Sequence, residues 1–172
     1  GMVELEDFND NWKNEYLEEE KLLKEVLGDR IVSIHHVGST AIKGLKAKPI
    51  IDILMVVKDL DIVLELEELL KEYDYTNRGP QGVLDRYLFV KGPEDARTHY
   101  VHIVLPESNT YYNQILFRDY LNKYPEYVKK YCELKQELAL KYANDRKMYT
   151  ASKSEFINSV IELSKKEFNI ES

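Results

Sequence analysis

The first predicted element is a helix near the start of the chain. From Trp12 to Leu27, apolar residues recur every three or four positions, and Gly28 follows them. This spacing predicts an amphipathic helix that ends at the glycine, with Asn9 or Asp10 as its cap.

Two mainly apolar runs come next, at residues 31–37 and 50–57. Short apolar runs rich in β-branched residues predict buried strands. Helical spacing returns in residues 59–73, where Asp59 or Asp61 is the expected cap.

Two further strands are predicted at residues 83–90 and 98–105. A loop with strong turn residues precedes them at 77–82, and Gly92-Pro93 lies in the turn between them. Because this connection is short, the two strands are expected to form an antiparallel hairpin. The sheet is therefore predicted to be mixed and to have about four strands.

The chain reads as helical from Ser108 onward. Pro125 is suited to the first position of a second helix in this half. Asn144 or Asp145 is the expected cap of a last helix that runs to about Phe168. The many tyrosines here, at helical spacing, are interpreted as core residues whose hydroxyl groups lie at the water boundary.

These elements predict an α/β (α+β) fold, a mixed β-sheet packed by helices with a helical C-terminal region. A length of 172 residues fits a single domain. Within it we expect a core at about 1–106 and a helical extension at about 107–172.

The composition limits the classes of partner. With 31 acidic and 24 basic residues the formal net charge is −7, which argues against a general nucleic-acid-binding protein but leaves room for a local basic pocket. The acidic run at residues 18–20 is interpreted as a solvated helix face.

We find no apolar run of membrane-spanning length and no signal-peptide pattern, so we expect a cytoplasmic protein that does not bind membranes. The single Cys132 excludes an intramolecular disulfide.

The stretch from Gly38 to Asp52 carries the first candidate chemistry. Gly38-Ser39 ends the first strand, and successive amides in such a turn can bind an anion such as phosphate. Asp52 interrupts the second apolar strand, where a buried carboxylate must be paired or bind a metal. Two interpretations stay open: Asp52 is a ligand of Mg²⁺ or Mn²⁺, or it is a structural acid bonded to the backbone.

This stretch resembles a known family. Gly-Ser, about a dozen residues and then an acid on a strand is similar to the nucleotidyltransferase motif. The wider pattern resembles the GrpB family (UPF0157) at His36-Val37-Gly38-Ser39-Thr40-Ala41, Lys48-Pro49-Ile50-Ile51-Asp52-Ile53, Arg97-Thr98-His99-Tyr100-Val101-His102, Phe117-Arg118-Asp119-Tyr120-Leu121 and Tyr149 with Lys153. The resemblance implies a nucleotidyltransferase-like fold. It also shows a departure, because Leu54 stands where that superfamily has a second acid.

Four histidines lie on the predicted strands. His35 and His36 are adjacent and His99 and His102 are three apart, so the members of each pair face opposite sides. We expect His36 and His102 to converge with Asp52 in an acid–base or metal role. The alternative is that they are partly buried structural imidazoles.

Several cations are candidate phosphate ligands. Lys48 precedes the strand of Asp52, and Arg86 lies on the hairpin with Arg97 beside it. In an acidic protein, cations that converge on one cleft favour a ligand carrying phosphate. The alternative is ordinary surface salt bridges. The family resemblance favours Arg118, Tyr149 and Lys153 as site residues; the last two lie one helical turn apart.

Three functional hypotheses follow. In the first, the protein is a metal-dependent nucleotidyl or phosphoryl transferase: Gly38 and Ser39 hold the phosphate of a nucleotide or phosphorylated small molecule, and Asp52 holds Mg²⁺ or Mn²⁺. In the second, which Leu54 favours, it is a non-catalytic binding module. GrpB-like segments occur fused to dephospho-CoA kinase, so the resemblance links this module to coenzyme A metabolism. In the third, the tyrosine-rich helices bind a protein. A third acid beside Asp52, with Asp85 as the candidate, would favour the enzyme.

Overall fold

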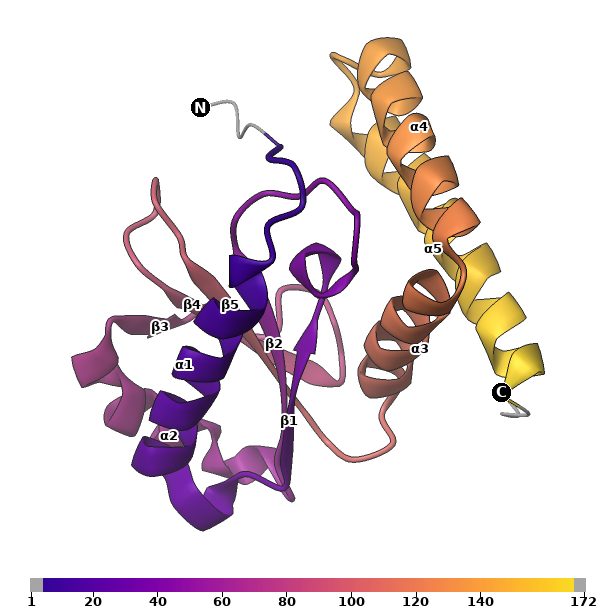
Figure 1. The fold of residues 1–172 in the computed structure, drawn as a ribbon. Coiled ribbons are helices and arrows are strands. Elements are labelled where there is room, and N and C mark those ends of the chain that lie inside the picture. The colour runs from indigo at the N-terminus through magenta and orange to yellow at the C-terminus, as the bar shows by residue number, and fades with distance from the viewer. Residues whose placement is uncertain (1–4, 169–172) are drawn as a thin grey trace.

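The fold is built on a five-stranded mixed sheet. The structure is a computed structural model that describes residues 5–168. The strands lie in the order β1-β2-β5-β4-β3, and only β2 and β5 pair in parallel (Figure 1). Their bounds are Ser33–Val37 (β1), Ile51–Val56 (β2), Tyr75–Asn77 (β3), Arg86–Lys91 (β4) and His99–Val104 (β5).

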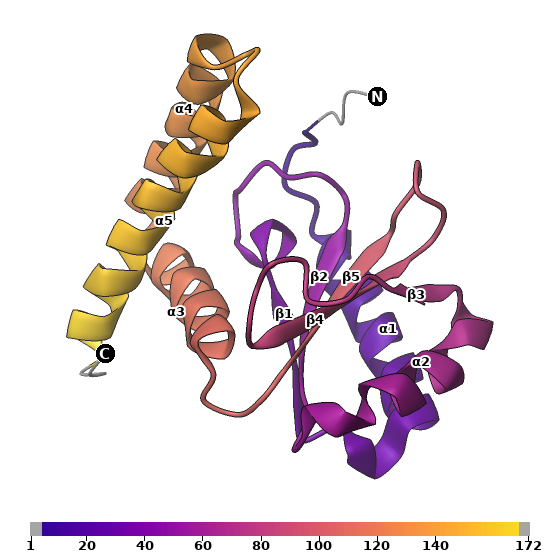
Figure 2. The ribbon, with the colours of Figure 1, turned by 180° about the vertical axis from the view of Figure 1, so that it is seen from behind.

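The helices lie on both faces of this sheet. One face is covered by α1 and α2, and α3 packs on the other, with α4 and α5 beyond it (Figures 1 and 2). Their bounds are Asn11–Leu27 (α1), Val63–Leu70 (α2), Asn109–Lys123 (α3), Pro125–Lys141 (α4) and Arg146–Glu167 (α5). Within residues 5–168, no helix combines the length and the apolar content that crossing a membrane requires.

Strand β2 carries apolar side chains on both faces. Ile51, Ile53 and Met55 point into the core beneath α1 and α2. Leu54 and Val56 point the other way, into a smaller core beneath α3. Because strand side chains alternate, Asp52 belongs to the α3 face, beyond the part of it that α3 covers.

A separate core joins the connector between β1 and β2 to the C-terminal helices. Ile42 and Leu45, both fully buried, pack against Leu121 of α3, Tyr131 of α4 and Val160 of α5. Burial of each large apolar side chain contributes about 1.5–3 kcal/mol. This core holds α4 and α5 beside the Gly38-Ser39 turn.

The predicted order of elements is confirmed. Ser108 caps α3 with a bond from the Tyr111 amide, Pro125 is the first residue of α4, and Asp145 caps α5. The antiparallel β4–β5 hairpin is also confirmed.

The sheet differs from the prediction at its β3 edge. Strand β3, Tyr75–Asn77, was not predicted, because three residues carry no readable period. The strand predicted from residue 83 begins at Arg86, since residues 83–85 still belong to the preceding turn.

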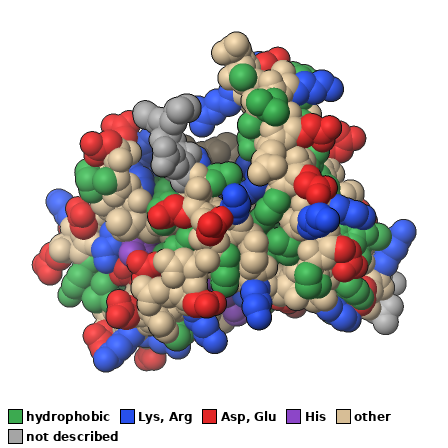
Figure 3. All heavy atoms as spheres, turned by 45° about the horizontal axis from the view of Figure 1, so that its top comes forward, with side chains coloured by type: hydrophobic (Ala, Val, Ile, Leu, Met, Phe, Trp, Pro, Cys, Tyr) green, Lys and Arg blue, Asp and Glu red, His purple; other side chains and the backbone are tan. Residues whose placement is uncertain are grey.

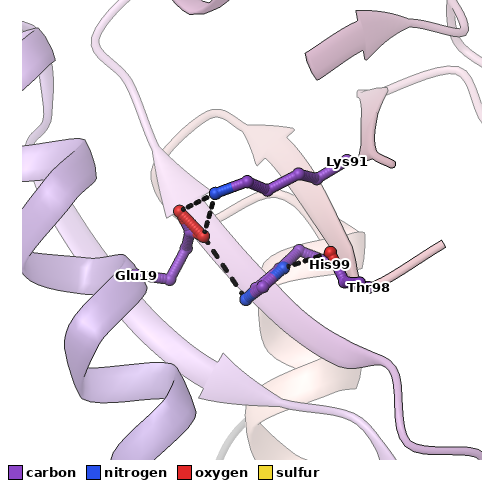
Figure 4. A network of polar contacts seen from close by, with 4 residues as sticks. All are labelled: Glu19, Lys91, Thr98 and His99. Atoms are coloured by element: carbon purple, nitrogen blue, oxygen red, sulfur yellow. Dashed lines mark hydrogen bonds and ion pairs between the residues drawn. The ribbon is translucent and has the colours of Figure 1, made fainter. Parts of the chain in front are cut away.

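The interpretation of the acidic run at residues 18–20 as a solvated helix face is wrong for Glu19 of α1. Its side chain is only 4% exposed, and both carboxylate oxygens accept bonds from Lys91 Nζ at 2.8 Å. His99 Nε2 lies 3.3 Å from the same carboxylate, while its Nδ1 is bonded to the Thr98 hydroxyl (Figure 4). Burial lowers the pKa of His99. This network ties α1 to β4 and β5.

We predict that Lys91→Met lowers the free energy of unfolding by about 3 kcal/mol, because it leaves the buried Glu19 carboxylate without its main cation. Urea unfolding measures the change. The matched control is Lys24→Met, which removes an exposed lysine whose i,i+4 partner Glu20 is half-buried on the same helix, and it should cost at most about 0.5 kcal/mol. Equal losses in the two variants would contradict the structural role of the network.

Candidate ligand-binding site

The site begins where the Gly38 turn meets Asp52. Val37 pairs with Asp52 across β1 and β2, so the turn passes over the aspartate. Gly38 has a φ of 75°, and a Cβ there would lie 2.5 Å from Asp52 Oδ2. Only glycine combines that backbone with that approach. Gly38-Ser39 and Asp52 therefore lie at the same end of the sheet.

Asp52 is held by a chain of hydrogen bonds on the α3 face. His102 Nε2 lies 2.9 Å from Asp52 Oδ1, and Arg86 Nη1 lies 3.3 Å from His102 Nδ1. Because arginine only donates, Nδ1 is the acceptor and Nε2–H donates to Asp52. His102 thus orients the carboxylate, and Arg86 in turn orients the His102 ring.

A cleft of about 270 Å³ opens beside Asp52, between the sheet and the C-terminal helices. Ser39 and Lys48 contribute from the connector between β1 and β2. Lys135 of α4 and Lys153 of α5 contribute from the opposite wall. Three tyrosines complete the polar lining: Tyr100, Tyr131 and Tyr149.

The three lysines of the cleft have no acidic partners. Among the ion pairs of residues 5–168, none involves Lys48, Lys135 or Lys153. Lys135 is 8% exposed; its Nζ is 3.5 Å from the Lys46 carbonyl oxygen and 4.6 Å from the centre of the Tyr131 ring. Burial, with the charges of neighbouring lysines, lowers the pKa of Lys135 and of Lys153. Keeping these two lysines charged therefore costs the folded protein free energy, and a bound anion would reduce that cost.

The space-filling view shows how the charges are distributed around this region. Over most of the visible surface, acidic and basic side chains are interspersed (Figure 3). The molecule is hollowed between the upright end of the α4–α5 pair and the sheet, and basic side chains lie at the edge of the hollow. The three lysines of the cleft lining thus form a local basic pocket in a chain whose formal net charge is −7.

The structure brings together some of the predicted site residues. Ser39, Lys48, Asp52, Tyr149 and Lys153 line the same cleft. In addition, Gly38 contacts Asp52, and His102 and Arg86 lie directly behind it.

His36 and Arg118 lie elsewhere. The His36 ring stacks on Tyr16 of α1 with the centres 4.8 Å apart, and its Nε2 is 2.9 Å from the Thr40 hydroxyl. Burial lowers the pKa of His36 to about 4, so it is neutral near pH 7. Arg118 donates to the His36 carbonyl oxygen and pairs with Asp119. Both line a second hollow beside α1, so the expected convergence of His36 on Asp52 does not occur.

Two further candidates also have structural partners. Arg97 donates to the Gly92 carbonyl oxygen within the β4–β5 turn. Asp85 accepts bonds from the amide and the hydroxyl of Thr110, at the start of α3. Asp85 is therefore not a third acid beside Asp52.

The residues present do not fit a two-metal centre. Leu54, at the second acid position of the superfamily motif, is fully buried beneath α3. Within residues 5–168, no three His, Cys, Asp or Glu side chains are grouped as metal ligands. Two-metal phosphoryl transfer needs several carboxylates around the ion pair. Binding of one Mg²⁺ or Mn²⁺ through Asp52 stays a prediction.

Lys135 and Tyr100 were missed as site residues. Lys135 lies on the buried stripe of α4, with Val128, Tyr131 and Leu138. A lysine at a core position of an amphipathic helix was the available signal. Tyr100 pairs with Asp52 across β2 and β5, a register that only the structure reveals.

The arrangement of sheet, Gly-Ser turn and strand aspartate defines a nucleotidyltransferase-like fold. The Cid1 poly(U) polymerase structure superposes with a TM-score of 0.51 at 14% identity, covering 77% of this chain and 42% of that chain. At this identity the likeness concerns the fold alone.

The chain belongs to the GrpB family, whose sequence model, described as GrpB protein, matches residues 2–163. The crystal structure of conserved protein GrpB from Enterococcus faecalis superposes with a TM-score of 0.85 at 30% identity, covering 96% of this chain and 99% of that chain. The Glutamate-rich protein GrpB of Alkalihalophilus pseudofirmus is 38% identical over 165 residues, covering 94% of this chain and 95% of that protein. The UPF0157 protein YqkA of Bacillus subtilis is 37% identical over 164 residues. That match covers 95% of this chain but 48% of the relative, so the chain spans about half of its length.

We predict that Leu54→Asp destabilises the protein by about 3–5 kcal/mol and that Mn²⁺ does not restore the stability. The new carboxylate would be buried among apolar side chains beneath α3. Thermal melting with and without Mn²⁺ tests this, with Asp52→Asn/Leu54→Asp as the control. Recovery by Mn²⁺ that depends on Asp52 would contradict it and would show that position 54 reaches a metal site.

Proposed function

We propose that the protein binds a nucleotide or phosphorylated small molecule in the cleft beside Asp52, and that it acts as a ligand-binding module rather than as a two-metal transferase. The observation that carries this proposal is the convergence of Lys48, Lys135 and Lys153 on one cleft, with no carboxylate partner among residues 5–168. Each comes from a different segment of the chain, so the cluster is a product of the tertiary fold.

Anion binding explains why a buried lysine is present at all. A charge taken out of water is costly unless it is paired. Lys135 has a long contact with one carbonyl oxygen, and its lysine neighbours disfavour its charge further. Hydrogen bonds between ammonium groups and phosphate oxygens are charge-assisted and would offset this cost.

The Gly38-Ser39 turn supports the same ligand. Ser39 lines the cleft on the side opposite α4 and α5, and successive amides in such a turn can form an anion-binding nest. Phosphate bound here would bridge the sheet and the C-terminal helices.

The single carboxylate of Asp52 favours ligand binding over catalysis as the role of the site. Asp52 is the acidic residue of the cleft lining, and its Oδ1 is engaged by His102. Leu54 is buried beneath α3 and Asp85 is bonded to Thr110, and residues 5–168 hold no group of three or more His, Cys, Asp or Glu side chains around a metal position. A metal-dependent transferase would lack the ligands that its mechanism requires.

The test is Lys135→Met, studied by isothermal titration calorimetry with ATP and with glycerol 3-phosphate as probes. We expect affinity for the phosphate compound that binds the wild type to fall by about tenfold or more, since a charge-assisted hydrogen bond contributes roughly 1.5–3 kcal/mol. Without ligand, the variant should melt at the same or a higher temperature, because the uncompensated charge is gone.

The matched control is Lys129→Met, which removes an exposed lysine of the same helix. It should leave affinity and melting temperature unchanged. If neither probe binds the wild type, or if the two variants lose affinity equally, the proposed function is wrong.

A further inference from the structure

We propose that the cleft selects the phosphate monoester of a small molecule, bound as a dianion without a metal ion. This inference rests on the proposed function and narrows its ligand from any phosphorylated compound to one class. It differs from what a nucleotidyltransferase-like fold suggests by itself, a nucleoside triphosphate carried with Mg²⁺.

The first argument is the charge of the cleft. Its lining has three lysines and one aspartate, which leaves a formal excess of two positive charges. A phosphate monoester has a second pKa of about 6, so it carries close to two negative charges at neutral pH. The monoester therefore neutralises the cleft, whereas a triphosphate would bring charge that no lining cation matches.

The second argument is the position of Asp52. Its carboxylate lies against the Gly38 turn, so a phosphate held by that turn is close to a fixed negative charge. An additional phosphate group directed toward β2 would be repelled by it. A single phosphate between the Gly38-Ser39 turn and the lysines Lys135 and Lys153 can direct its charged oxygens toward the lysines, so Asp52 acts as an element of specificity against a second phosphate group.

The third argument concerns the metal that would otherwise reduce the charge of a triphosphate. A cation at Asp52 would have one carboxylate from the lining and three ammonium groups around the same cleft. The lysines already supply the positive charge that Mg²⁺ supplies in kinases and polymerases. A cation bound here would duplicate the role of the lysines and would be repelled by them.

The fourth argument is size. A cleft of about 270 Å³ lies below the volume of roughly 300–1,000 Å³ that is typical of drug-sized ligands. The tyrosine rings Tyr100, Tyr131 and Tyr149, with Ile50, supply apolar surface beside the lysines. A compact organic group attached to one phosphate fits these walls.

The experiment is calorimetry with four probes, each in EDTA and in Mg²⁺. The probes are phenyl phosphate, glycerol 3-phosphate, methyl phenyl phosphate and ATP. The first two are monoesters, and the third is a diester with a single charge. We expect a monoester to bind at least about tenfold more tightly than the diester and than ATP–Mg²⁺, with the same affinity in EDTA and in Mg²⁺.

The pH dependence gives an independent reading of the dianion. Monoester affinity should rise as pH passes through about 6, where the second proton is lost, and fall again at alkaline pH as the lysines of lowered pKa lose their charge. The diester should lack the rise near pH 6. The Lys135→Met variant should lose the preference for monoester over diester, while Lys129→Met keeps it.

The outcomes separate this inference from the proposed function. Tighter binding of ATP in Mg²⁺ than of either monoester would overturn the inference and leave the proposed function standing. Equal affinity for monoester and diester would overturn it as well. If none of the four probes binds, both proposals fail.

Discussion

The contact between the β1–β2 connector and the C-terminal helices decides where the cleft lies. Ile42 and Leu45 are fully buried against Leu121, Tyr131 and Val160, which come from three different helices. Without this core, the lysines of α4 and α5 would have no fixed relation to Asp52. The same short segment that carries the Gly-Ser turn therefore also holds the wall opposite it. Side chains of α3 reinforce the contact, because Asn122 donates to the Ala41 carbonyl oxygen and accepts from the Lys43 amide.

With α4 and α5 fixed beside the connector, the two walls of the cleft carry different charges. One wall presents Asp52, oriented through His102 and Arg86, and the other presents lysines whose ammonium groups are not neutralised by carboxylates of residues 5–168. Elsewhere the fold pairs its buried charges, as at Glu19, where two bonds from Lys91 compensate the carboxylate. The contrast indicates that the cleft keeps its positive charge for a ligand. The fold keeps the Gly-Ser turn and one acid of the superfamily motif, while Leu54 serves the core beneath α3.

Much of this fold could be predicted from the sequence because local signals and tertiary structure agree. Ser108, Pro125 and Asp145 act in the structure as their residue types suggest, and the Gly38–Asp52 relation follows from strand pairing. The failures involve residues whose partners are distant in sequence. Glu19 reads as solvated because Lys91 and His99 are 72 and 80 positions away. His36 is not bonded to Asp52; its ring stacks on Tyr16, which is 20 positions away in the sequence. Lys135 reads as part of a charged helix until its place on the buried stripe of α4 is seen.

The most direct test of the central claim is the ionisation of the cleft lysines. After reductive ¹³C-methylation, NMR titration gives the pKa of each lysine side chain, and Lys135→Met and Lys153→Met variants assign the two signals. The account predicts that, without ligand, both groups titrate below the usual pKa of about 10.4, and that adding phenyl phosphate raises both pKa values. The account would be contradicted if both lysines titrate at the usual pKa and phenyl phosphate leaves them unchanged.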